Sequence, residues 1–333
     1  MKLLESRREL KRRRRRVWWR RNSRRLMWVF FAVLFCLTLF FALLGSVEPE
    51  PISRVEVPVS GSQLAPPSQP SPPPPPVVGG DLEDRLLALG DAHPGEYGVA
   101  VYDARSGRTV GVNAQRPMEA ASLAKLPVLL TLYKEAAGGG LDLDEGIVIQ
   151  ASDIQSYGTG VLHNYPVGYE MTLRECAWVM IKESDNTAWA MLERRLGKDR
   201  ISRELDSLGA GDTDYGAYRT TPEDVLLVLR AISDPRYTNP RLSSEMLGAM
   251  TDTAHEDRLP EPLPEDVRVA HKVGSVEDTY SDAGVVFSDG MRDAEDGYYV
   301  VAVVSGGMDE EAAEGAIREV SLTTYRSLRP DSD

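Results

Sequence analysis

The stretch Ala121-Ser122-Leu123-Ala124-Lys125 places a hydroxyl and an amine three residues apart in the sequence. At helical spacing, two such side chains lie on the same face, one turn apart. A serine hydroxyl is a weak nucleophile until a neighbour accepts its proton, and a desolvated lysine can do so because burial disfavours its charged form. The pattern therefore predicts Ser122 as a nucleophile and Lys125 as its base. The plain alternative is a helix-capping serine beside a solvated lysine.

Two further polar stretches strengthen this prediction. Ser184-Asp185-Asn186 falls between two expected helices, and Lys272-Val273-Gly274 falls in an expected strand. In isolation, the first is typical of an ordinary polar loop and the second of an exposed strand residue followed by a bulge. Their presence raises the Ser122 and Lys125 pattern above what chance alone would produce.

The elements that would carry these residues form a globular domain over residues 81–330. The expected elements are a helix over 81–89, strands over 97–103 and 108–113, a helix from the nucleophile stretch to about 137, helices over 172–182 and 187–196, a helix starting at 221, strands from 272 that include 283–287 and 298–304, and a helix over 310–328. Thr172 and Glu175 have the spacing of a capping box. Cys176, Trp178 and Met180 are expected in the core. This order predicts an α/β (α+β) fold, with one antiparallel sheet built from both ends of the chain, flanking helices and an inserted helical subdomain.

Charge is distributed unevenly along the chain. Residues 1–25 contain 13 Lys/Arg and 2 Asp/Glu, which leaves 25 basic and 49 acidic residues for 26–333. Because phosphate contacts need cationic surface, the acidic body argues against nucleic acid as its partner. The basic block could serve nuclear localisation or nucleic-acid binding, but its position beside an apolar run favours a membrane role.

An uncharged run of 19 residues, Leu26 to Leu44, is long enough to cross a bilayer core as a helix. The basic flank predicts residues 1–25 as a cytoplasmic tail, residues 26–45 as a single-pass signal anchor, and the rest outside the cell. A cleaved signal peptide is the alternative. We favour a retained anchor, because the run is longer than the usual apolar h-region of a signal peptide and no clear Ala-x-Ala cleavage site follows it.

Residues 46–80 contain 11 of the 22 prolines. This composition predicts a polyproline II stalk that reaches at most about 100 Å, at about 3.1 Å per residue. A ligand for SH3-type domains is the alternative, although such domains would lie on the other side of the predicted membrane.

Metal and disulfide chemistry find no support in the sequence. Cys36 lies in the apolar run and Cys176 in the globular part, so we expect no disulfide between them. The four histidines form no cluster with metal-ligand spacing, and we predict neither a zinc site nor a cofactor. One of them, His271, precedes Lys272 and is expected on the opposite face of its strand, without a catalytic role.

The three motifs, in this order and context, resemble the penicillin-recognising serine hydrolases, most closely the class A β-lactamases. The resemblance covers about 85–330. It extends to the helix, loop and helix around Ser184-Asp185-Asn186 and to RTTPEDVLLVLRAI, which is similar to the helix that follows the omega loop of that family.

The resemblance implies a role for each residue of the site. Ser122 would form an acyl-enzyme and Lys125 would accept its proton, while Ser184 would relay a proton to the departing nitrogen. The backbone N–H groups of Ser122 and Ser275 would hold the oxyanion. The other roles implied concern the substrate: Asn186 would hold Lys125 and the substrate amide, Lys272 would attract the substrate carboxylate, and Gly274 would let a substrate lie against the strand.

The sequence departs from the family pattern at two places. Class A enzymes carry an omega-loop glutamate that activates the water for deacylation, whereas the interval Leu208 to Arg219 contains none. Asp212 or Asp214 are the available substitutes. Val273 stands where the family usually has Thr or Ser, so a hydroxyl that would bind the substrate carboxylate is missing.

Three functional hypotheses follow from these observations. The first is a membrane-anchored, extracytoplasmic β-lactamase-like hydrolase that acts on β-lactams or related amides. The second is a penicillin-binding D-Ala-D-Ala peptidase or transpeptidase with slow deacylation, motivated by the missing glutamate. The third is a non-catalytic sensor or scaffold that binds cell-wall fragments. The partners expected are therefore a β-lactam or a peptide-like wall fragment, and the membrane.

Overall fold

The computed structural model describes residues 81–93, 95–287, 297–305 and 309–329. The predicted tail (1–25), membrane anchor (26–45) and stalk (46–80) lie outside these residues. Within the described ranges, no helix has both the length and the apolar composition needed to cross a membrane.

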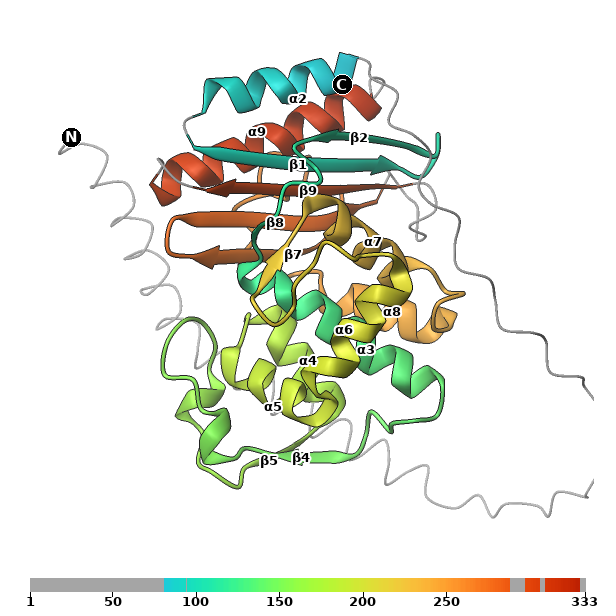
Figure 1. Cartoon of the computed structure of the whole chain (residues 1–333), viewed down its shortest axis with the longest axis vertical. Coiled ribbons are helices and arrows are strands. Elements are labelled where there is room, and N and C mark those ends of the chain that lie inside the picture. Colours follow the sequence, from blue (N-terminus) through green and yellow to red (C-terminus); the bar gives the residue numbers. More distant parts are fainter. Residues whose placement is uncertain (1–80, 94, 288–296, 306–308, 330–333) are drawn as a thin grey trace, which may run out of the picture. The chain divides into compact units, whose positions relative to one another are not determined.

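A five-stranded sheet forms one layer of the domain, with the strand order β2-β1-β9-β8-β7 and antiparallel pairing throughout (Figure 1). The strands are β1 (Glu96–Asp103), β2 (Arg108–Val112), β7 (Val269–Val276), β8 (Thr279–Val286) and β9 (Tyr298–Ser305). The early strand β1 pairs with the late strand β9, so both ends of the domain contribute to one sheet, as the sequence predicted. The edge strand β7 carries the Lys272 motif.

The sheet is covered on both faces, and the alternation of side chains along β1 shows why. Val99 and Val101 belong to a core formed with α2 (Asp81–Ala92) and α9 (Glu310–Leu328). Ala100, which points the other way, belongs to the larger core formed with the remaining helices. Figure 1 shows α2 and α9 together on one side of the sheet.

The remaining helices pack against the face of the sheet opposite α2 and α9. They are α3 (Lys125–Ala137), α4 (Leu173–Lys182), α5 (Asn186–Leu196), α6 (Lys198–Leu208), α7 (Pro222–Ser233) and α8 (Pro240–Ala249). Short elements complete this part of the domain: η1 (Ala121–Ala124), η2 (Ala151–Asp153), η3 (Leu162–Asn164), and the paired strands β3 (Met118–Glu119) with β6 (Arg219–Thr220) and β4 (Gly146–Val148) with β5 (Glu170–Thr172). Every residue of α3 from Lys125 to Tyr133 is buried, so this helix is central to the core.

The predicted capping box at the start of α4 is present. Thr172 Oγ1 accepts from the Glu175 N–H at 3.1 Å, and the Glu175 carboxylate accepts from the Thr172 N–H at 2.8 Å. Replacing Thr172 by alanine leaves the Glu175 N–H without this acceptor. We expect a loss of about 1 kcal/mol in the free energy of unfolding, measured by chemical denaturation. A Thr238→Ala control, outside any helix cap, should change it much less.

Two local expectations need correction. Cys176 and Met180 are fully buried, but Trp178 is 37% exposed, and the amine of Lys182 lies 5.3 Å from the centroid of its ring. Trp178 is therefore a surface residue, because its position on α4 turns it away from the face that packs against α5. The nucleophile stretch itself begins as the 3-10 turn η1, and the α-helix starts only at Lys125.

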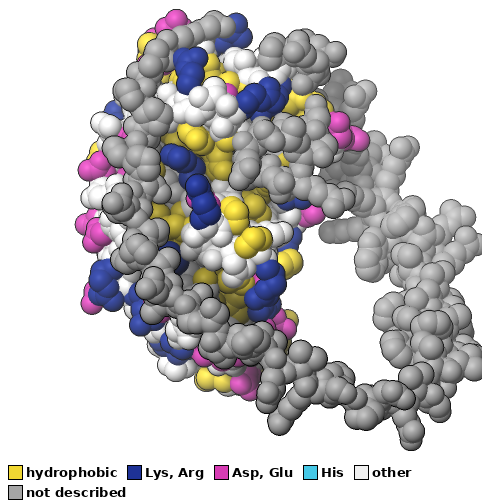
Figure 2. All heavy atoms as spheres, turned by 90° about the vertical axis from the view of Figure 1, so that its right-hand side faces the viewer, with side chains coloured by type: hydrophobic (Ala, Val, Ile, Leu, Met, Phe, Trp, Pro, Cys, Tyr) yellow, Lys and Arg dark blue, Asp and Glu magenta, His cyan; other side chains and the backbone are white. Residues whose placement is uncertain are grey.

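The surface of the described domain mixes both signs of charge. Figure 2 shows acidic and basic side chains interspersed among hydrophobic ones on one face. Most ion pairs of the described residues join exposed or half-buried side chains, for example Arg116 with Glu96 and Arg195 with Glu145. Such pairs contribute little to stability, so the fold depends mainly on its two apolar cores.

Candidate active site

Ser122 lies in a turn whose backbone is held in an uncommon conformation. Ala121, immediately before it, has φ of 46°, and Ser184, on the loop between α4 and α5, has φ of 52°. Non-glycine residues rarely adopt this left-handed region, at a cost of about 1–2 kcal/mol each. Such backbone strain clusters at functional sites, where the surrounding structure holds side chains in place for chemistry.

Lys125 is fully buried, and its amine contacts three of the other predicted site residues: Ser122, Ser184 and Asn186. Its Nζ lies 3.0 Å from Ser122 Oγ and 3.2 Å from Ser184 Oγ. It also donates to the Ser184 carbonyl at 2.6 Å and to Asn186 Oδ1 at 2.7 Å. A neutral amine has two N–H donors and one lone pair. The two shorter contacts use both donors, which leaves the lone pair for a serine hydroxyl.

The protonation state of Lys125 suits such an arrangement. Burial lowers the pKa of its amine to about 7, although the negative charge of Asp185 opposes this shift. At neutral pH a large fraction of Lys125 is therefore uncharged and able to accept a proton. A group with a pKa close to the working pH is the most effective general base.

Ser184 joins the two buried lysines. Its hydroxyl lies 3.1 Å from Ser122 Oγ and accepts from Lys272 Nζ at 2.9 Å. Lys272 also donates to the Val273 carbonyl at 2.7 Å. Burial and the nearby charge of Lys125 lower the pKa of Lys272 well below its ordinary value. The four side chains thus form a continuous path for protons from the nucleophile to the edge of the sheet.

Asp185 holds the loop of the second motif in place. The Asp185 carboxylate caps α5 by accepting from the Ala188 N–H, and it also accepts from the N–H groups of Val161 and Leu162. Gly160 packs so closely that a Cβ there would lie 2.3 Å from an Asp185 oxygen. Asp185 therefore positions the loop, while Asn186 faces Lys125 with one end of its amide and donates to the Tyr157 carbonyl at 3.2 Å with the other.

The third motif lies against the nucleophile turn. A Cβ on Gly274 would lie 3.2 Å from the Ser122 backbone nitrogen and 2.5 Å from Ser281 Oγ. No side chain fits between β7 and η1, which explains the glycine. Ser275 follows on the same edge strand and is exposed, so the structure brings all seven predicted site residues to one place.

One charged residue of the site carries no signal in the sequence. Arg258 lies in the long connection between α8 and β7, and its side chain is only 4% exposed. Its guanidinium donates to the carbonyls of Gly274 and Ser281 at 2.8 and 2.7 Å, and to Ser275 Oγ at 2.6 Å. It adds a positive charge that acts on Lys272, and the guanidinium also pairs with Glu314 on α9 at 3.5 Å.

The segment that replaces the omega loop places no carboxylate beside Lys125. Asp212 and Asp214 are both exposed, and Asp214 accepts from the Ala217 N–H within its own turn. The indole of Trp189, on α5, lies beside the lysine instead, with its ring centroid 5.3 Å from Lys125 Nζ. Its Nε1 donates to the hydroxyl of Tyr215, which comes from the omega-like segment. An aromatic wall thus occupies this side of the lysine.

Comparison with known proteins agrees with this geometry. Residues 81–328 match the beta-lactamase enzyme family. A β-lactamase of Streptomyces albus G is 28% identical over 275 residues, which cover 74% of this chain and 85% of that protein. The structure of PBP-A superposes with a TM-score of 0.69 at 25% identity, over 75% of this chain and 96% of the other. The fold is also shared with a β-lactamase from Sphaerobacter thermophilus DSM 20745, with a TM-score of 0.67 and 24% identity over 76% and 98% of the two chains.

A mixed domain with a five-stranded antiparallel sheet, helices on both faces and a serine hydroxyl in contact with a buried lysine has the architecture of a serine acyl-transfer enzyme. The chain belongs to the beta-lactamase enzyme family, and the resemblance inferred from its three motifs is confirmed. It is accordingly a β-lactamase-like serine hydrolase.

Proposed function

We propose that the protein opens β-lactam rings through an acyl-enzyme on Ser122. The observation that carries this proposal is the contact of one hydroxyl with a buried amine of lowered pKa at 3.0 Å and with a second hydroxyl at 3.1 Å. A nucleophile within hydrogen-bond reach of its base is the arrangement that this chemistry requires.

Each proton that moves during acylation has a donor and an acceptor in the site. Ser122 Oγ attacks the lactam carbonyl while Lys125 Nζ takes the hydroxyl proton. The backbone N–H groups of Ser122 and Ser275 hold the oxyanion that forms. When the C–N bond breaks, Ser184 gives its proton to the departing nitrogen and is reprotonated from Lys125. The product is an ester on Ser122 with an opened ring.

The substrate carboxylate has a binding site in spite of Val273. The Ser275 hydroxyl accepts from Arg258 at 2.6 Å, so its own proton is free to be donated to a carboxylate. The guanidinium of Arg258 carries a positive charge, and an incoming carboxylate favours the protonated form of Lys272. Two cations and one hydroxyl thus serve the carboxylate end of the substrate.

Restoring the missing hydroxyl tests this part of the site. A Val273→Thr variant offers a second donor to the carboxylate, and we expect the second-order rate constant of acylation by benzylpenicillin to rise about fivefold. Intact-protein mass spectrometry measures this rate constant. The control is a Val276→Thr variant, three residues further along β7, which should acylate at the wild-type rate. A fall in the rate with Val273→Thr would show that the carboxylate lies elsewhere.

We further propose that deacylation is slow, as in a penicillin-binding peptidase or transpeptidase. Hydrolysis of the ester needs a base for the attacking water. The carboxylates of Asp212 and Asp214 are exposed, and the omega-like segment places Tyr215 against the indole of Trp189, whose ring centroid lies 5.3 Å from Lys125 Nζ. A relative named PBP-A shares the fold at 25% identity, which supports this second function.

Time-resolved mass spectrometry with benzylpenicillin separates the hypotheses. Slow deacylation predicts an adduct of one intact penicillin that persists for minutes or longer. A transient adduct with continuous consumption of penicillin would favour an efficient β-lactamase instead. No adduct on folded protein, combined with thermal stabilisation by wall peptides, would favour a non-catalytic sensor.

We also propose that residues 26–45 anchor the domain to the membrane, with the N-terminus in the cytoplasm and residues 81–330 outside. This proposal is supported by the uncharged run of 19 residues and by the basic tail before it. Protease treatment of intact cells should release the domain from the membrane fraction. Protection of the domain in intact cells would contradict the proposed orientation.

A further inference from the structure

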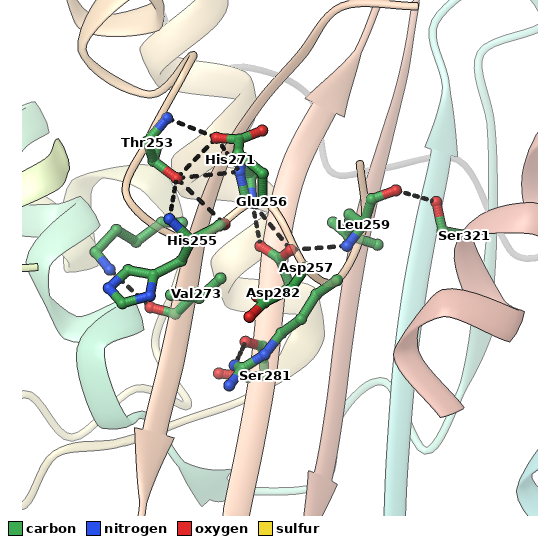
Figure 3. Close-up of polar contacts among 12 residues, drawn as sticks. Thr253, His255, Glu256, Asp257, Leu259, His271, Val273, Ser281, Asp282 and Ser321 are labelled. Atoms are coloured by element: carbon green, nitrogen blue, oxygen red, sulfur yellow. Dashed lines mark hydrogen bonds and ion pairs between the residues drawn. The ribbon is translucent and has the colours of Figure 1, made fainter. Parts of the chain in front are cut away.

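The position of Arg258 depends on the connection between α8 and β7, because the residue lies on no helix or strand. Two hydrogen bonds of the next residue, Leu259, hold this connection in place. The Leu259 N–H donates to Asp282 Oδ2 at 3.0 Å, and the Leu259 carbonyl accepts from Ser321 Oγ at 2.7 Å (Figure 3). Asp282 lies on β8 and is fully buried. Its carboxylate is therefore one of two points that hold Arg258 from the C-terminal side.

His271 links this carboxylate to the other side of Arg258. Its Nδ1 lies 2.9 Å from both oxygens of Asp282, and its Nε2 lies 3.2 Å from Glu256 Oε1. Glu256 is two residues before Arg258, and its carboxylate also accepts from the backbone N–H and the hydroxyl of Thr253. Figure 3 shows the imidazole between the two carboxylates. One side chain on β7 thus connects both ends of the short segment that carries Arg258.

The charges around the imidazole favour its protonated form. His271 is fully buried and faces Asp282 from β8 and Glu256 from the connection, with the Thr253 hydroxyl 3.4 Å from Nε2. Burial alone would lower the pKa of His271, but the two carboxylates outweigh it and raise the pKa to about 9. Because the folded pKa exceeds the ordinary value of about 6.5, the network is complete at neutral pH and is lost as the pH rises through about 9.

We propose that His271, bridging Asp282 and Glu256, is a positioning residue that fixes Arg258 on Ser275 and so governs recognition of the substrate carboxylate. This inference rests on the proposed function, since it assigns the carboxylate end of the same site. His271 does not touch the substrate. It acts on the opposite side of β7 from the reacting groups, through the two carboxylates and the backbone of residues 256–259.

A His271→Asn variant tests the inference, because the amide keeps a donor for Asp282 but carries no charge and is too short for Glu256. The matched control is His93→Asn, which removes a histidine that follows directly after α2 and lies 3.4 Å from Glu319 on α9. Acylation is measured with benzylpenicillin and with its methyl ester, which lacks the carboxylate charge. We expect His271→Asn to lose about tenfold in rate constant with the acid and less than twofold with the ester, while His93→Asn matches the wild type.

The pH profile gives a second readout that general loss of stability would not produce. The ratio of acid to ester rate constants should show a fall above pH 9 in the wild-type protein that is absent from His271→Asn, while any change caused by titration of Lys272 should be common to both proteins. Equal losses with both substrates, or an unchanged ratio, would overturn the proposal. Glu256→Gln, a change at a partly exposed side chain, provides the same test if His271→Asn does not fold.

Hydrogen exchange separates this inference from the proposed function. The Leu259 amide should exchange faster in His271→Asn than in the wild type or in His93→Asn, whether or not the protein acylates. If the wild type forms no adduct with either substrate, the proposed function fails. Unchanged exchange at Leu259 in the variant would then reject the positioning role independently.

Discussion

A Ser122→Ala variant is expected to form no covalent adduct with benzylpenicillin under conditions in which the wild-type protein is fully labelled. The substitution removes the only atom that can form the ester in the proposed mechanism, while the amine of Lys125 keeps its contacts with the Ser184 carbonyl and Asn186. Intact-protein mass spectrometry measures the effect directly. The wild-type adduct should have the mass of the complete penicillin, because ring opening releases no leaving group.

The matched control is Ser207→Ala, which removes a hydroxyl on α6 that donates to the Glu204 carbonyl at 2.8 Å and lies 3.5 Å from the Tyr237 hydroxyl. This variant should be labelled at the wild-type rate. Both variants should unfold at temperatures close to that of the wild type, because neither hydroxyl is part of an apolar core. Labelling of Ser122→Ala at the wild-type rate would show that another nucleophile reacts, and would reject the proposed acyl-enzyme.

Much of the site could be predicted from the sequence because its motifs are local. The three-residue spacing of Ser122 and Lys125 fixes their relative position through the geometry of a single helical turn. Ser184 and Asn186 are likewise neighbours within one loop. That these segments lie beside Lys272 could be predicted only from the family resemblance. The structure shows the physical reason: β7 packs directly on η1 because Gly274 lacks a Cβ.

Other parts of the site depend on tertiary structure alone. Arg258 is one of many arginines in the sequence, and it becomes part of the site only through carbonyls on β7 and β8. His271 was expected to lie away from the reacting groups, and it does, but its link to Glu256 requires a long irregular connection whose path no periodic pattern specifies. Trp178 was assigned to the core from its neighbours, whereas its own place on α4 turns it outward.

The two buried lysines also illustrate why composition is a poor guide to charge in the site. Lys125 and Lys272 contact the same hydroxyl of Ser184, and burial lowers the pKa of both amines, with the charge of Lys125 lowering that of Lys272 further. The free site therefore holds fewer protons than two lysines would carry in water. A substrate carboxylate near Lys272 favours the protonated form of that amine, while Lys125 remains able to act as a base for Ser122.

The proposed base gives the second large expected effect. In a Lys125→Met variant the hydroxyl of Ser122 has no amine to accept its proton, and we expect the rate constant of acylation to fall by about 10²–10⁴-fold. In the wild type the rate should rise with pH through about 7, because only the neutral form of Lys125 accepts a proton and burial lowers its pKa to that value. Stopped-flow labelling with a fluorescent penicillin between pH 5.5 and 8.5 measures both effects.

The control for this variant is Lys134→Met, the same substitution about two and a half turns further along α3, at an amine that contacts the Tyr237 carbonyl and ring. It should retain both the rate and the pH profile of the wild type. Lys125→Met leaves the Ser184 carbonyl and Asn186 Oδ1 without their donor, so its melting temperature must be measured beside its rate. A folded Lys125→Met protein that acylates at the wild-type rate, with the same rise through pH 7, would exclude Lys125 as the base. Because Ser184 is the other group within reach of the Ser122 hydroxyl, that result would move the proton acceptor to the Ser184-Lys272 pair.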